Sequence, residues 1–192
     1  MVRLFVSALV LVSLAAQDLT QKEADTMAVK VDAMEARAAK ALPATAPPLK
    51  TTFTEREASA YLKFKAELPT GIVNPQVMIL GGDRIEARAI VDIDIVRKSK
   101  QRSLFDPMNY LGGTVELRAS GSLRGVNGTG TLVIDSTSVA GVPVPKSLLQ
   151  EIVHFYVKSL GHPNGFDLDK PFPLPVGIRQ LEMQKGVAIV VQ

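Results

Sequence analysis

Side chains that commonly carry out acid–base or metal chemistry are scarce in this sequence of 192 residues. It contains two histidines and no cysteine, which excludes disulfides, iron–sulfur clusters, thiolate zinc sites, cysteine nucleophiles and histidine-rich metal cages. It also contains no GxSxG elbow, P-loop, HExxH motif or GxGxxG following a strand. The sequence therefore predicts a protein that is not an enzyme, with no catalytic residue, metal or cofactor.

Two pairs of carboxylates have a spacing that metal sites use. Asp92 and Asp94 resemble the paired acids with which glycosyltransferases hold a metal–nucleotide. At i and i+2 of an alternating strand they share its polar face, which favours a solvent-facing interpretation. Asp167 and Asp169 have the same spacing in a proline-rich loop without a His or Glu cluster. We expect an ordinary loop there, and a metal site is the alternative.

The histidines and a glycine-rich stretch have structural interpretations as well. His154 is expected on the polar face of a helix, and His162 near its C-terminal end, where a cation is favoured. A catalytic base is the alternative for either. The glycines between residues 121 and 130 lie between two strands, unlike a phosphate cradle, and we expect them to let the sheet bend sharply. The acceptor pattern Asn127-Gly128-Thr129 is expected to be a tight turn rather than a glycosylation site.

Alternating hydrophobicity predicts a set of strands. Residues 84–97 carry the clearest alternation, and residues 114–124 repeat it. Further strands are expected at 72–80, 129–139, 178–183 and 187–191, with hairpin turns at Gly81-Gly82-Asp83 and Asn127-Gly128.

Helical periodicity predicts three helices. Residues 18–42 form an amphipathic helix with a thin apolar stripe, ended by the PATAPP segment. Thr54 and Glu57 form a capping box for a helix that runs to about residue 68. The stretch KSLLQEIVHFYVKSL has a broad apolar face suited to lie across a sheet. This order of elements predicts an α+β fold with an antiparallel sheet.

The first residues have the pattern of a secretory signal. Arg3 precedes an apolar run that is shorter than a spanning helix requires, and Ser13 and Ala15 are small residues at the cleavage positions. A membrane anchor is the alternative. We therefore expect a signal peptide at 1–16, a helix with a proline-rich linker at 17–49, and a domain at 50–192 in the periplasm or cell envelope. The net charge of +3 is too balanced for a nucleic-acid partner.

A basic run adjoins an apolar, partly aromatic loop after the long strand. Its residues suit transient contact with an anionic membrane surface, because cations are attracted to it and apolar side chains can enter the interface. The alternative is a solvated connection whose apolar residues fold back onto the core. The predicted membrane-contact residues are Arg97, Lys98, Lys100, Arg102 and Phe105.

Four stretches together resemble a known family. They are FTEREASAYL, IEARAIVDIDIV, GVPVPKSLLQEIV and PLPVGIRQLEMQKGVAIV. In pattern and order the chain from Phe53 onward resembles the LmeA-like phospholipid-binding proteins of the tubular lipid-binding (TULIP-like) class. The resemblance implies a strongly curved antiparallel sheet wrapped around a core helix, with a phospholipid or other acyl-chain lipid in the apolar groove between them. The expected lipid-binding residues are Ile85, Ala89, Val91, Ile93, Ile95, Val115, Leu117, Leu123, Leu149, Ile152, Val153 and Tyr156.

The same residues allow three other interpretations of the function. The same apolar faces can meet in a closed core, which would make the protein an exported adaptor or scaffold with a protein partner docked through residues 18–42. An envelope enzyme would need Asp92, Asp94 or His154 to converge in a pocket. A pore or assembly component would need exposed apolar strands in an oligomer.

Overall fold

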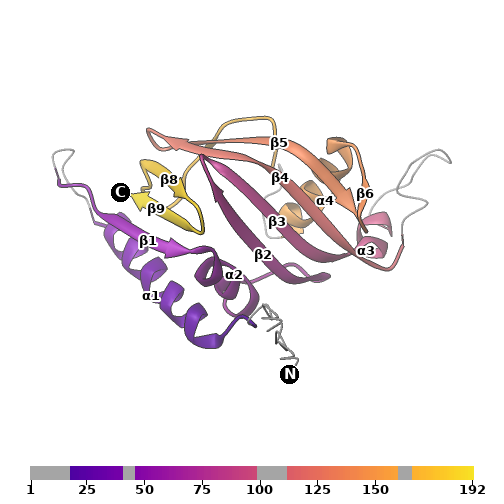
Figure 1. The fold of residues 1–192 in the computed structure, drawn as a ribbon, viewed down its shortest axis with the longest axis horizontal. Coiled ribbons are helices and arrows are strands. Elements are labelled where there is room, and N and C mark those ends of the chain that lie inside the picture. Colours follow the sequence, from indigo (N-terminus) through magenta and orange to yellow (C-terminus); the bar gives the residue numbers. More distant parts are fainter. Residues whose placement is uncertain (1–17, 41–45, 99–111, 160–165) are drawn as a thin grey trace, which may run out of the picture.

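The structure is a computed structural model that describes residues 18–40, 46–98, 112–159 and 166–192, and the predicted signal segment lies outside these ranges. The described chain forms an α+β fold with an antiparallel sheet, as the sequence predicts (Figure 1). The elements are α1 (Gln21–Ala38), β1 (Lys50–Thr54), α2 (Glu55–Phe64), β2 (Ile72–Gly81), β3 (Arg84–Asp92), α3 (Ile93–Lys98), β4 (Thr114–Val126), β5 (Thr129–Val139), β6 (Val142–Pro143), α4 (Lys146–Ser159), β7 (Phe172–Pro173), β8 (Gln180–Gln184) and β9 (Val187–Val191).

Strand β4 is the centre of the sheet. It pairs along its length with β3 on one side and β5 on the other, and β2 continues the sheet beyond β3. A second group, β1–β9–β8, joins β4 through a single pair, Gly125 with Leu181. The two short strands β6 and β7 both pair with β5. All these pairings are antiparallel.

Tight turns fix the register of the long hairpins. Asn127 and Gly128 connect β4 to β5 and both have positive φ, at 51° and 78°. Two consecutive residues of this kind match the right-handed twist of the flanking strands. The β2–β3 turn has the same character at Gly82 and Asp83, with φ values of 60° and 64°. The sequence prediction of both turns is confirmed.

The predicted strand at 84–97 is wrong in its last five residues. Strand β3 ends at Asp92, and α3 begins at Ile93. The Asp92 Oδ1 atom accepts hydrogen bonds from the backbone N–H groups of Asp94 (2.9 Å) and Ile95 (3.4 Å), as a helix N-cap does. Asp94 therefore lies in the first turn of a helix that Asp92 caps, and not on the polar face of a strand as the sequence predicts.

Helix α2 covers the outer edge of β2. Ser59, which is buried, accepts a hydrogen bond from the backbone N–H of Val77 (2.9 Å) and donates one to its carbonyl (3.1 Å). A carboxylate oxygen of Glu55 accepts from the N–H of Ile79 (2.9 Å), whose carbonyl accepts from Gly186 (2.7 Å). These contacts occupy backbone groups that would otherwise form an open sheet edge. The helix is four residues shorter than the sequence predicts, since it ends at Phe64.

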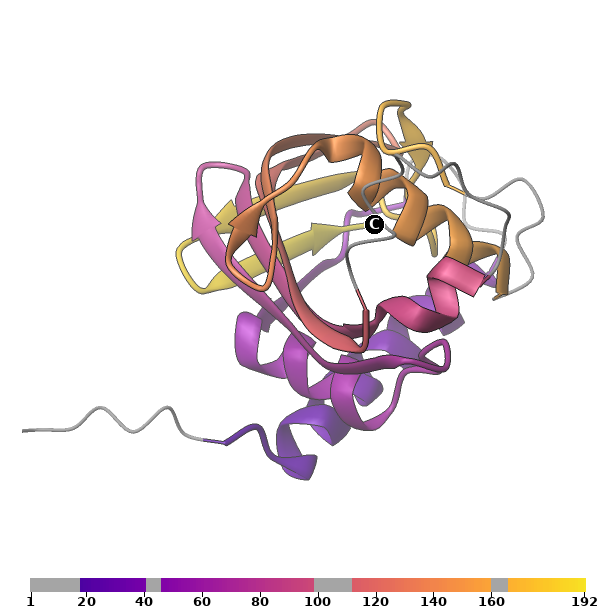
Figure 2. The same cartoon turned by 90° about the vertical axis from the view of Figure 1, so that its right-hand side faces the viewer.

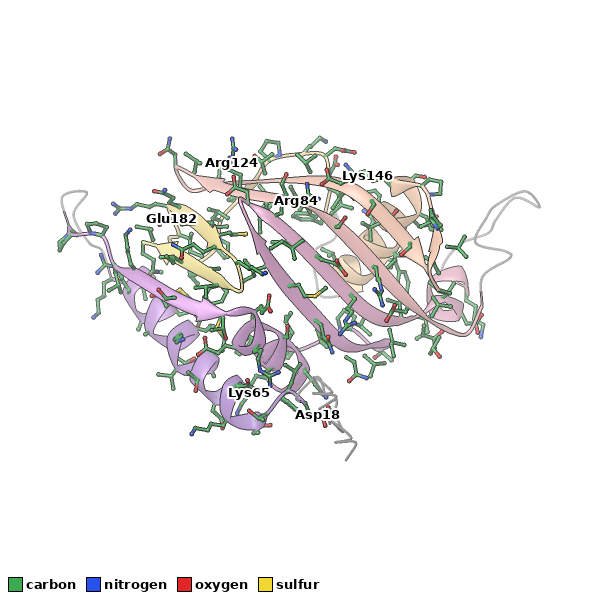
Figure 3. All side chains as sticks on the ribbon, in the orientation of Figure 1. Asp18, Lys65, Arg84, Arg124, Lys146 and Glu182 are labelled. Carbon is green, nitrogen blue, oxygen red and sulfur yellow. The ribbon has the colours of Figure 1, made fainter. Side chains whose placement is uncertain are left out.

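Helix α1 packs on α2. It begins with a capping box of Thr20 and Glu23, and it buries Ala24, Met27 and Met34. Three ion pairs join it to α2 and the residue that follows: Lys30 with Glu57 (2.8 Å), Glu23 with Arg56 (2.6 Å), and Asp25 with Lys65 (2.8 Å; Figure 3).

The described residues form two apolar core clusters. The first, here called the α4 cluster, consists of Val91, Ile93, Val139, Leu148 and Ile152, and it places α3 and α4 on the same side of the sheet (Figure 2). The second, the α1 cluster, consists of Met34, Ile178 and Val190. No helix among the described residues is both long and apolar enough to cross a membrane.

We predict that Arg56→Gln raises the pKa of Glu23 toward its ordinary value. This pKa is lowered from 4.5 to about 2, chiefly by the hydrogen bond from Arg56 and further by hydrogen bonds from Thr20. Because the folded-state pKa is the lower one, the pair stabilises the fold above about pH 4.5, and this stability is lost as the pH falls toward 2. An NMR titration of the Glu23 carboxyl in both proteins measures the shift, and identical titration curves would contradict the assignment.

Candidate functional site

The apolar inner face of the sheet is built by alternate residues of three strands. Residues on β3, β4 and β5 lie opposite one another in rows, because side chains alternate between the two faces of a strand. One row pairs Ala89 with Leu117 and Leu117 with Val139. The next rows are Ala87–Ala119–Thr137, Ile85–Gly121–Ile134 and Leu123–Leu132. The inner face therefore changes from large aliphatic residues to small ones and back again along the strands.

Helices α3 and α4 close the first end of this face. Ile93, Leu148 and Ile152 pack against Val91 and Val139, and all five are at most 7% exposed. Ala89, Val115 and Leu117 are half-buried and pack against this cluster. The part of the predicted lipid site around Val91 and Ile152 is thus filled by the protein's own side chains.

The opposite end of the inner face is closed by residues from the C-terminal part of the chain. A Cβ atom at Gly125 would lie 2.7 Å from Leu181 Cγ and 3.0 Å from Leu174 Cδ1. At Gly130 it would lie 2.6 Å from two ring atoms of Phe172. The sequence predicts that these glycines let the sheet bend. In the structure, Gly125 and Gly130 leave room for Leu174, Leu181 and Phe172 against the strands.

The middle of the inner face is partly exposed. Ile85 and Leu123 are half-buried, and Ala87 is exposed. Neither core cluster of the described residues includes Ile85 or Leu123. Gly121 lies between Ile85 and Ile134 in the same row and is itself buried, with the backbone of Val133 against the position of its missing Cβ. The half-buried apolar strip of Ile85, Leu123, Leu132 and Ile134 between the two packed ends is here called the trough.

The predicted lipid-binding residues fall into three groups. Val91, Ile93, Leu149 and Ile152 are buried; Ile85, Ala89, Ile95, Val115, Leu117, Leu123 and Val153 are half-buried; the side chain of Tyr156 lies outside the described residues. Ile93 and Ile95 belong to α3 and not to the strand. The same inner face also carries Leu132 and Ile134, which the predicted lipid site omits although they alternate within 129–139.

The predicted membrane-contact residues are mostly outside the structure's described ranges. Lys98 is exposed at the end of α3. Lys100, Arg102, Phe105 and the side chain of Arg97 are not among the described residues, so their role stays a prediction.

The candidate chemical residues have structural partners. Asp94 Oδ2 accepts a hydrogen bond from the N–H of Gly113 (3.0 Å). Asp167 accepts from the N–H of Asp169 (3.0 Å), and this bond, together with one from Lys170, lowers the pKa of Asp167. Asp169 pairs with Lys146 at the start of α4. Within the described ranges, no three acidic or histidine side chains gather as a metal site would require.

Three hollows lined by described residues lie away from the inner face. One lies between α2 and β2 beside Arg56 and Arg88, one on the outer face around Arg118 and Ser136, and one at the end of α1 beside Arg179. They are lined largely by polar and charged side chains, unlike the trough.

No family model, curated protein or solved structure matches the chain. Its function is therefore inferred from the geometry of its own residues.

We predict that Gly121→Ala destabilises the protein by about 3 kcal/mol, because the added methyl group meets backbone that cannot move aside. A Cβ atom at Gly121 would lie 2.1 Å from the carbonyl oxygen of Val133, beside the bulge in the β4–β5 pairing. The control is Gly82→Ala, which meets no atom within 4 Å and has a φ of +60°, so it costs about 1 kcal/mol. Urea unfolding measures both, and equal losses would show that the close approach is absent.

Proposed function

We propose that this chain is an exported lipid-binding protein that holds a phospholipid or similar acyl-chain ligand against the inner face of its sheet. In this proposal the sheet curves strongly around α4, and the acyl chain lies in the trough between the two packed ends. The protein would serve envelope lipid transport or maintenance without catalysing a reaction.

The observation that carries the proposal is the partial exposure of an apolar face that is closed at both ends. Ile85 and Leu123 are half-buried and Ala87 is exposed, whereas Val91 and Val139 at one end of the face are buried. Exposed apolar surface that is continuous and walled by packed side chains is typical of a ligand site. The resemblance to LmeA-like proteins supports the same function.

The free energy gained by burying an acyl chain is large enough for binding at such a site. Burying about ten methylene groups at about 0.8 kcal/mol each yields about 8 kcal/mol, which offsets typical costs of association. Affinity that comes from apolar burial requires a large apolar surface, and it does not require many precisely positioned polar groups. The predominantly apolar rows of the inner face fit that requirement.

Delivery to a membrane completes the proposal. Lys98 and the basic run that follows it would bring the protein to an anionic surface, with Phe105 entering the interface. Each cation near such a surface contributes about 1 kcal/mol, and salt weakens this attraction.

The second candidate is an exported adaptor or scaffold whose apolar faces are fully closed. The tight packing at both ends favours it, because Ile93 and Ile152 are at most 2% exposed and Leu174 reaches Gly125. A partner would then dock elsewhere, for example on α1. Lipid retention separates the two candidates.

Export predicts a specific mature terminus. N-terminal sequencing of the protein recovered from the envelope should begin at Ala16 or Gln17, since small residues at positions 13 and 15 suit cleavage there. Recovery of the intact chain from a cytoplasmic fraction would contradict export.

We predict that Leu123→Trp fills the trough and reduces bound lipid at least tenfold. The matched control is Val133→Trp, on the paired strand but on the outer face, where the side chain is 52% exposed. Binding is measured with fluorescently labelled phosphatidylglycerol, and thermal unfolding checks that both variants are folded. Unchanged binding by a folded Leu123→Trp protein would show that the trough does not hold the lipid.

A further inference from the structure

A hollow with a basic lining lies where α1 ends and β9 finishes. Figure 1 shows these two ends close together and away from α4. Arg37 and Lys40 come from the end of α1, and Arg179 precedes β8. The remaining lining residues are Ala38, Gly177 and Gln192. Residues distant in the sequence thus bring three cations to one concave surface.

These three cations differ from most others in the structure. Arg56, Arg84, Arg118 and Arg124 each have a carboxylate partner. Within the described ranges, no acidic side chain pairs with Arg37, Lys40 or Arg179; Arg37 donates to the carbonyl oxygen of Pro47 (2.7 Å). Any α-carboxylate at Gln192 would lower the local charge from +3 to +2 and leave it positive. Like charges held in one hollow favour the binding of an anion.

Gln192 adds a second, independent feature. Its side chain is 4% exposed, and its Nε2 atom donates to the carbonyl oxygens of Met34 (2.9 Å) and Val176 (2.6 Å). These two bonds identify the amide nitrogen, so the other atom, Oε1, is an acceptor. Oε1 is buried and has no hydrogen-bond partner among the residues that the structure describes. A buried acceptor without a donor is unfavourable and would be satisfied by a donor on a ligand.

The wall of the hollow is held in an uncommon conformation. Val176 has a φ of 47° and Gly177 a φ of 69°, and the N–H of Ile178 donates to the carbonyl of Pro175 (3.0 Å) to close the turn. A β-branched residue with positive φ is strained, and such strain gathers at functional positions. This turn aims the Val176 carbonyl at Gln192 and so fixes the side chain that carries the free acceptor.

We propose that this hollow binds a phosphate group that carries or adjoins a hydroxyl. The phosphate oxygens would accept hydrogen bonds from Arg37, Lys40 and Arg179, while the hydroxyl donates to Gln192 Oε1. Hydrogenphosphate, a phosphate monoester and a phosphoglycerol headgroup all combine these two groups. Sulfate supplies the charge but, near neutral pH, no donor. The site does not depend on an acyl chain in the trough.

Isothermal titration calorimetry of the full protein with inorganic phosphate and with sulfate tests the chemistry. At pH 6.5 and low ionic strength, we expect phosphate to bind about tenfold more tightly than sulfate, the discrimination expected when one anion leaves a buried acceptor unpaired. Arg179→Gln, at an exposed residue, should weaken phosphate binding about tenfold. Lys185→Gln is the matched control, because it removes the same charge from an exposed residue at the opposite end of the β8–β9 hairpin.

Vesicles identify the source of the phosphate. Cosedimentation with phosphatidylglycerol vesicles that is lost in Arg179→Gln but kept in Lys185→Gln indicates a lipid headgroup, with phosphatidylcholine vesicles as the reference. Phosphate binding in solution without Arg179-dependent cosedimentation indicates a soluble phosphate compound. Equal binding of sulfate and phosphate, equal loss in both variants, or no binding to either probe would overturn the proposal. Retention of labelled lipid in the trough is independent of Arg179, so a failure here leaves the proposed function standing.

Discussion

Strand β4 pairs with three other strands, and the arrangement of the rest of the sheet depends on these pairings. Its first part pairs with β3 and β5 alone, whereas at Gly125 it also pairs with Leu181 of β8. That junction requires a residue without a side chain, because Leu181 and Leu174 occupy the space where a Cβ would stand. This close approach attaches the β8–β9 hairpin to β4, and the hydrogen bond from Gly186 to Ile79 attaches the same hairpin to β2.

The junction also divides the apolar interior into two. The α4 cluster fills one end of the inner face, and the α1 cluster lies beyond the junction with Leu174 and Leu181 against it. The buried residues of both clusters are at most 8% exposed, as in an ordinary protein core. The trough lies between the two clusters, neither of which includes Ile85 or Leu123. Helix α1 contributes to the second cluster through Met34, so it stabilises the fold as well as covering α2.

The sequence indicates local features well and non-local ones poorly. Alternation located β4, the Asn127-Gly128 turn located the start of β5, and the capping box located the start of α2, because these signals depend on neighbouring residues. The end of β3 was misplaced because Ile93 and Ile95 continue the alternation, although Asp92 caps a helix there. Two-residue strands such as β6 and β7 carry no periodic signal. The contacts of Gly125 and Gly130, and the meeting of Arg37, Arg179 and Gln192, depend on folding and could not be predicted from spacing.

The proposed function requires an acyl chain on the inner face of the sheet. Native mass spectrometry detects such a ligand in the wild-type protein after incubation with phosphatidylglycerol vesicles and re-isolation. We expect a complex heavier than the protein by the mass of one phospholipid, and we expect it to disappear after extraction with organic solvent. A protein that keeps its lipid-free mass after incubation with the vesicles would exclude bound lipid and favour a closed core.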